Sequence, residues 1–139
     1  MTPGQISAVE GSLAAVDLDQ LTADFYRRAF AEDPSLSQMF TSDPAVQRRR
    51  FAAELDEIVH SMRSIEAFEP GVRALGERHR RYGVRAPHYR LMGRALLAAL
   101  EAALDERWTA EVAEAWALAY NLTAETMLLG AMECDESRD

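Results

Sequence analysis

Residues 72–83, with the sequence VRALGERHRRYG, combine a helical pattern of apolar positions with a histidine that the pattern turns inward. One face of this predicted helix carries Val72, Leu75, Gly76 and His79, at intervals of three and four residues. The opposite face carries arginines, as a solvent-facing surface would. The stretch therefore predicts a helix that presents His79 to the protein interior. An imidazole in the interior needs a polar partner there.

The segments on both sides of this stretch are also predicted to be helical. No stretch alternates apolar and polar residues over a length that a strand would need. The expected helices cover residues 3–16, 17–30, 34–40 (a short turn-like segment), 44–62, 72–81, 89–104 and 109–132. We therefore expect an all-α fold in a single domain, residues 1–139, with frayed ends at 1–3 and 133–139.

Capping residues and prolines set the expected helix boundaries. Thr2 followed by Pro3 begins the first helix, and Asp17 is a candidate N-cap for the second. The Asp33-Pro34 pair ends the second helix, and Asp43-Pro44 begins the long one that follows. The stretch Glu69-Pro70-Gly71 is expected to separate that region from the helix at 72–81.

Composition excludes several functional classes. The 139 residues include 15 Arg, no Lys and 23 Asp plus Glu, for a net charge of −8, so nucleic acid and anionic membranes are poor partners. The chain has one cysteine, Cys134, and no apolar run approaches the roughly 18 residues of a membrane span. We expect a soluble cytoplasmic protein that binds neither nucleic acid nor a membrane.

Few residues offer chemistry at recognisable spacing. Among the three histidines, His60 points away from the apolar face of its helix, and His88 lies in the first turn of another. His79 alone faces inward, although a lone inward histidine is more often a hydrogen-bonded core residue than a ligand. The sequence has no HExxH or CxxC motif and no glycine-rich phosphate loop. The residues alone therefore leave the ligand open.

Several aromatic and histidine landmarks, in order along the chain, resemble the globins, and specifically the bacterial globins related to flavohaemoglobin. The matching segments are DFYRRAF (24–30), LSQMF (36–40), Gln47, LGERH (75–79), YGV (82–84), HY (88–89) and AWALAY (115–120). The similarity extends from about residue 21 to about residue 132. It implies a globin fold in which the helices pack around a pocket for haem b (iron protoporphyrin IX).

The resemblance also implies which residues hold the haem. His79 would be the axial ligand of the iron, which explains an imidazole on an apolar stripe. Phe40 would stack on the porphyrin, and Leu75 and Val84 would pack against it. Arg50 would reach a haem propionate. Without the resemblance, the three apolar residues could equally be ordinary core.

On the other side of the iron, Tyr26 and Gln47 would face the sixth coordination position. Their hydroxyl and amide groups would donate hydrogen bonds to a bound diatomic ligand in an otherwise apolar pocket. Without the resemblance, Tyr26 reads as a core residue and Gln47 as an exposed residue at a helix start.

The chain departs from the family pattern at two positions. Phe51, which would line the distal side, stands where an aliphatic residue is more usual, so the distal pocket is expected to be tight. Tyr89 matches a tyrosine that supports the proximal histidine, but Ala131 stands where the family has a supporting glutamate. Glu133 lies about 200° further round the helix and is not expected to replace it. His79 is therefore expected to donate to a backbone carbonyl or water.

These features imply a globin that reversibly binds oxygen, and nitric oxide as a further ligand, as a carrier or scavenger. We expect no flavin domain, so a nitric oxide dioxygenase, the first alternative, would depend on a separate reductase. A gas sensor or interaction module with the globin fold is the second alternative. The protein is expected to be a monomer or a homodimer.

Overall fold

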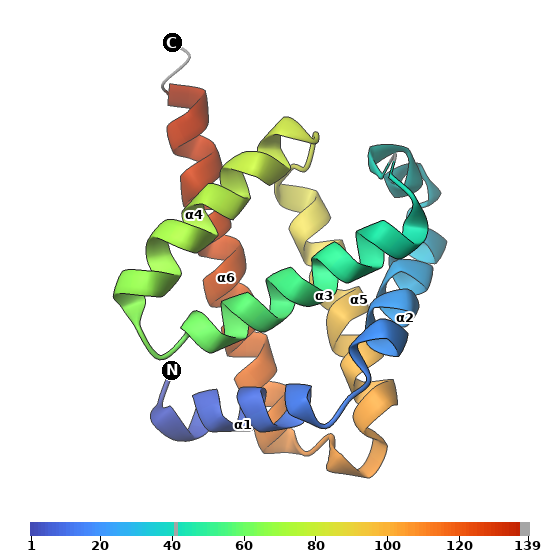
Figure 1. Ribbon diagram of the computed structural model, residues 1–139, viewed down its shortest axis with the longest axis vertical. Helices are drawn as coiled ribbons and strands as arrows, with labels where there is room; N and C mark the ends of the chain where they lie inside the picture. The colour runs from blue at the N-terminus through green and yellow to red at the C-terminus, as the bar shows by residue number, and fades with distance from the viewer. Residues whose placement is uncertain (41, 137–139) are drawn as a thin grey trace.

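The structure is a computed structural model, which describes residues 1–40 and 42–136 (Figure 1). The helices are α1 (Pro3–Ala14), α2 (Leu18–Glu32), the 3-10 helix η1 (Pro34–Met39), α3 (Pro44–Ser61), α4 (Ile65–Arg81), α5 (Ala86–Leu104), the 3-10 helix η2 (Asp105–Arg107) and α6 (Ala110–Glu136). The described residues contain no strand, so the predicted all-α fold is confirmed. The expected frayed end at 133–139 lies partly outside the described residues.

The predicted caps begin the helices where the sequence placed them. Thr2 and Gln5 form a reciprocal capping box ahead of α1, with the backbone N–H of Gln5 donating to the Thr2 hydroxyl over 3.1 Å. The Asp17 carboxylate accepts hydrogen bonds at the start of α2, and the Asp43 carboxylate accepts one at the start of α3. Local side chains therefore define these ends.

The prediction that residues 69–71 lie between helices, with the next helix beginning at residue 72, was wrong. Helix α4 begins at Ile65 and continues through Pro70 without a break. Pro70 lacks the N–H that would bond to the carbonyl of Glu66, but both residues are exposed, so water can reach that carbonyl. The tertiary packing of the buried residues Phe68 and Val72 favours one continuous helix.

The helices pack in pairs around a shared interior (Figure 1). Helix α4 lies along α6, and α2 lies along α5, while α1 packs across the first part of α6. Trp116, which is 2% exposed, donates its indole N–H to the Ser12 hydroxyl over 2.7 Å and so ties α6 to α1. None of the described helices is long and apolar enough to span a membrane.

Two glycines allow α4 and α6 to approach closely. A Cβ atom at Gly76 would lie 1.9 Å from the backbone oxygen of Met127, and one at Gly130 would lie 2.0 Å from the backbone oxygen of Arg73. These contacts show that α4 and α6 run antiparallel in a fixed register. They also place α4 so that its last turn borders the interior.

Candidate functional site

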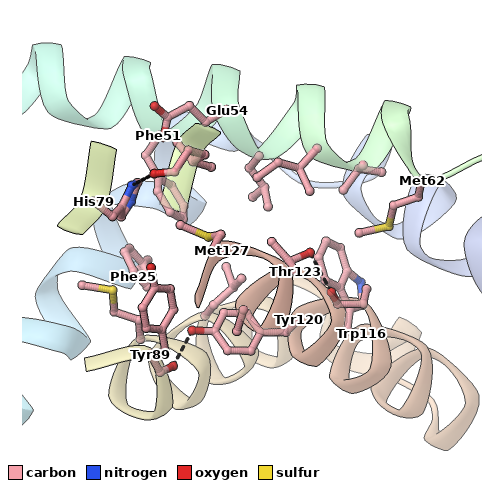
Figure 2. A pocket seen from close by; sticks show the side chains of 18 residues that line it. Phe25, Phe51, Glu54, Met62, His79, Tyr89, Trp116, Tyr120, Thr123 and Met127 are labelled. Atoms are coloured by element: carbon pink, nitrogen blue, oxygen red, sulfur yellow. Dashed lines mark hydrogen bonds between the residues drawn. The ribbon is translucent and has the colours of Figure 1, made fainter. Parts of the chain in front are cut away.

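Two adjoining pockets lie between α2, α3, α4, α5 and α6. The outer pocket, of about 850 Å³ including space open to solvent, is lined by residues that include Tyr26, Phe40, Gln47, Arg50, Phe51, His79 and Val84. The inner pocket, of about 740 Å³ including open space, is lined by residues that include Phe51, Leu75, His79 and Tyr89 (Figure 2). The structure thus brings every residue expected to contact haem or its ligand to the lining of these two pockets, which share Phe51, Glu54 and His79.

His79 lies in the last turn of α4 and borders both pockets (Figure 2). Its Nδ1 lies 2.9 Å from the backbone oxygen of Leu75, one turn earlier in the same helix. Burial lowers the pKa of His79, more than the hydrogen bond to Leu75 raises it. The ring is therefore neutral near pH 7, with Nδ1–H donating to Leu75 and the Nε2 lone pair available to a metal.

Tyr26 and Gln47 form the polar part of the opposite wall. The Gln47 amide donates to the Tyr26 hydroxyl oxygen over a long 3.5 Å. Burial raises the pKa of Tyr26 to about 12, so the hydroxyl keeps its proton in neutral solution. Since the hydroxyl oxygen accepts from Gln47, its own O–H is free to donate into the outer pocket.

Aromatic rings hold this wall in place. The rings of Phe25 and Phe51 stack with centroids 4.6 Å apart, and Tyr26 meets Phe51 edge-on at 5.8 Å. Phe40 lies edge-on to Tyr26 at 5.4 Å. These contacts join α2, α3 and the end of η1, so the bulky Phe51 belongs to a packed cluster that narrows the pocket.

The remaining predicted residues occupy the pocket's edge and floor. Arg50 and Val84 both line the outer pocket, where Arg50 is exposed and Val84 is buried. The turn between His79 and Val84 uses Gly83, whose φ of +97° suits glycine, and the backbone N–H of Val84 donates to the His79 carbonyl over 3.0 Å. Burial raises the pKa of Tyr89 to about 12.

The support of His79 comes from its own helix, and not from α6. The partner of Nδ1 is Leu75, and neither Ala131 nor Glu133 borders the pockets among the described residues. Glu133 is exposed and pairs with Arg73 on the outside of α4. The α4–α6 register places residue 130 beside residue 73, two turns before His79. The residues of α6 that share the inner pocket with His79 include Thr123 and Met127.

The other two histidines lie away from the pockets, as their spacing predicted. His60 is exposed, with Nδ1 2.8 Å from the backbone oxygen of Asp56. His88 accepts a hydrogen bond at Nδ1 from the backbone N–H of Arg85 over 2.9 Å, which caps the start of α5. Neither ring is placed to reach a metal beside His79.

The sequence analysis missed Glu54, an acidic residue that lines both pockets. It follows Phe51 by one turn of α3 and Gln47 by two, so its spacing places it on their face of the helix, but the enclosure of that face depends on the packing of other helices. Burial raises the pKa of Glu54 above its ordinary value.

The metal-binding groups near the pockets suit a metal that carries most of its ligands with it. The described residues contain no cluster of three or more His, Cys, Asp or Glu side chains that could hold a bare metal ion. His79 supplies one nitrogen at the border of a largely apolar space with aromatic walls. A flat metal porphyrin satisfies these conditions, since it supplies four nitrogen ligands and a large apolar surface.

Comparison with known proteins agrees with this chemistry. The globin family model matches residues 23–127. The flavohemoprotein of Bordetella parapertussis is 31% identical over 113 residues, which are 79% of this chain and 28% of that protein. The flavohemoprotein of Bacillus subtilis is 26% identical over 113 residues, with the same coverage of 79% and 28%. This chain thus spans less than a third of the length of these curated relatives.

Solved structures show the same fold. A bacterial globin from Campylobacter jejuni superposes with a TM-score of 0.86 at 21% identity, covering 97% of this chain and 99% of that one. An engineered carbene transferase from Rhodothermus marinus superposes with a TM-score of 0.83 at 24% identity, covering 99% of this chain and 96% of that one.

Proposed function

This chain belongs to the globin family, and from that premise we propose that it holds haem b between α3 and α4 and binds dioxygen reversibly. Nitric oxide is the second ligand that we propose for the same position. The observation that carries the proposal is the neutral imidazole of His79, held by Leu75 at the border of the pocket and opposite two hydrogen-bond donors.

Bound haem would supply an iron centre that coordinates diatomic gases. His79 would bind this centre through Nε2, while the carbonyl of Leu75 keeps Nδ1 protonated and fixes the plane of the ring. Phe40, Val84 and Leu75 would contact the porphyrin, with Phe51 narrowing the space on the far side. Arg50 would pair with a haem carboxylate at the mouth.

Tyr26 and Gln47 would give the pocket its preference for a polarised ligand. The Tyr26 hydroxyl donates into the outer pocket, and the Gln47 amide lies beside it. Bound dioxygen carries more negative charge than carbon monoxide, so two donors favour it. We place this activity in the cytoplasm, with a monomer or homodimer as the working form.

A nitric oxide dioxygenase that depends on a separate reductase is the second candidate. The observation that favours it is the similarity to flavohemoproteins. Against it stands the support of His79 by a backbone carbonyl, since a carboxylate would push more electron density toward the iron. A gas sensor that passes its signal to a partner is the third candidate.

Absorption spectra of the purified protein test the main proposal. We expect a five-coordinate spectrum for the reduced protein, because neither His60 nor His88 reaches the pocket, and distinct spectra after addition of oxygen or carbon monoxide. Oxygen should be released intact on lowering its pressure. A protein that takes up no haem would contradict the proposal. Rapid nitrate production from nitric oxide with an added reductase would favour the second candidate.

A further inference from the structure

Glu54 occupies an unusual place for an acidic side chain. It lines the outer pocket and the inner pocket, and it also lines a groove between α3 and α4 that reaches Arg78. It is half-buried, and Figure 2 shows it on α3 above the inner pocket, beside Phe51. Its carboxylate therefore lies where the apolar interior meets the charged edge of the pocket.

The cations at this edge do not neutralise Glu54. Arg50 lies one turn earlier on α3, and Arg78 approaches from α4, and both favour the charged carboxylate. Neither guanidinium forms a hydrogen bond with it, and burial outweighs their attraction, so the pKa of Glu54 stays raised. Glu57, one turn later, adds a like charge. Glu54 therefore does not hold the arginines in position by direct bonds.

Haem carries two carboxylates, which must lie at the charged edge because the rest of the pocket is largely apolar. Arg50 lines the outer pocket together with Glu54, and Arg78 meets Glu54 in the neighbouring groove between α3 and α4. We propose that Glu54 is a specificity residue that repels the haem carboxylates, so that the pocket releases haem faster than it would without this carboxylate. This inference rests on the proposed haem binding.

Two substitutions and two cofactors test the inference. Glu54→Gln removes the charge and keeps the shape, and Glu57→Gln makes the same change at an exposed position of α3 that lines neither pocket. Each protein, and the wild type, is loaded with haem or with haem dimethyl ester, which lacks the two negative charges. The measured quantity is the rate of cofactor transfer to excess apomyoglobin, followed by absorbance.

We expect Glu54→Gln to slow the loss of haem about 5- to 20-fold, the size of one like-charge interaction at a partly screened site. The same substitution should leave the loss of the dimethyl ester unchanged. Glu57→Gln should change neither rate by more than about twofold. Circular dichroism of the apoproteins checks that all three fold alike.

Three results would overturn the inference. An unchanged rate of haem loss in Glu54→Gln would mean that the carboxylate does not act on haem. Equal slowing with haem and with the ester would assign the effect to burial of a charge and not to repulsion. Faster loss would mean that Glu54 positions the arginines. A wild-type protein that takes up no haem would instead refute the proposed function, which keeps the two failures distinct.

Discussion

The two walls of the pocket hold their polar groups in different ways. On the α4 wall, the acceptor that orients His79 is the Leu75 carbonyl of the same helix, four residues away and 2.9 Å from Nδ1. On the opposite wall, the pair is made by Tyr26 of α2 and Gln47 of α3, 21 residues apart in sequence and 3.5 Å apart in space. The first arrangement needs only one helix, whereas the second needs two helices packed correctly.

This difference indicates which part of the site is rigid. The α4 wall keeps its imidazole orientation as long as α4 is helical, and α4 packs closely against α6 at Gly76 and Gly130. The α2/α3 wall depends on the packing of Phe25, Phe51 and Phe40, so a change there moves both donors. We therefore expect changes on the α4 wall to abolish binding and changes on the other wall to tune it.

The largest expected effect is that of His79→Ala. The substitution removes the one imidazole that borders the pockets among the described residues, so normal haem retention should be lost. Haem titration of the apoprotein, followed in the Soret region, measures this loss. His60→Ala and His88→Ala are the controls and should bind haem as the wild type does. An unaltered spectrum in His79→Ala would refute the assignment of the axial ligand.

The next effect concerns the packing that supports the α4 wall. Gly76→Ala would place a Cβ 1.9 Å from the backbone oxygen of Met127, so α4 must shift away from α6. We expect a loss of about 3 kcal/mol in the free energy of unfolding, measured by urea denaturation of the apoprotein.

Gly71→Ala is the matched control in the same helix, because nothing lies within 4 Å of its added Cβ. It should raise the free energy of unfolding by about 0.5–1 kcal/mol, through the better helix propensity of alanine. If both variants were equally stable, the close α4–α6 contact would not be what holds the wall.

Changes on the opposite wall should alter ligand release while haem stays bound. Tyr26→Phe removes a hydroxyl that stays protonated in neutral solution, since burial raises its pKa to about 12. A hydrogen bond to a partly charged ligand contributes about 1.5–3 kcal/mol, so oxygen release should accelerate roughly 10- to 150-fold. Stopped-flow measurement of oxygen dissociation tests this expectation, with carbon monoxide dissociation as the less sensitive control.

Gln47→Leu should accelerate oxygen release as well, within the same range. The substitution removes one donor and also frees the Tyr26 hydroxyl oxygen, so the two changes should not be additive. The double variant tests this coupling in the same stopped-flow assay. Unchanged rates in both single variants would rule out a polar wall opposite His79.

The smallest expected effect is that of Ala131→Glu. A carboxylate that accepts a hydrogen bond from His79 would lower the reduction potential of the haem. The α4–α6 register, however, places residue 130 beside Arg73, six residues before His79, so a glutamate at 131 should not reach the His79 ring and should leave the potential unchanged. Potentiometry of both proteins decides the question. A lower potential in the variant would show that α6 reaches His79 once haem is bound.

Features that depend on neighbours along the chain could be predicted from the sequence alone. Capping side chains such as Thr2 and Asp17 lie within three residues of the N–H groups that they bind, so their pattern is readable without a fold. The inward direction of His79 follows from the helical spacing of residues 72–79 for the same reason. The ordered landmarks that resemble the globins likewise needed no coordinates.

Features that depend on contacts between distant segments could be known only from the tertiary structure. The burial of Phe68 and Val72 keeps α4 helical through Pro70, although the local signal favours a break. The register of α4 on α6 depends on backbone contacts at Gly76 and Gly130, which no periodicity specifies. Glu54 became a pocket residue because α4 and α5 enclose that face of α3. The physical reason is that helix propensity acts over a few residues, whereas packing selects among helix arrangements by contacts that are far apart in sequence.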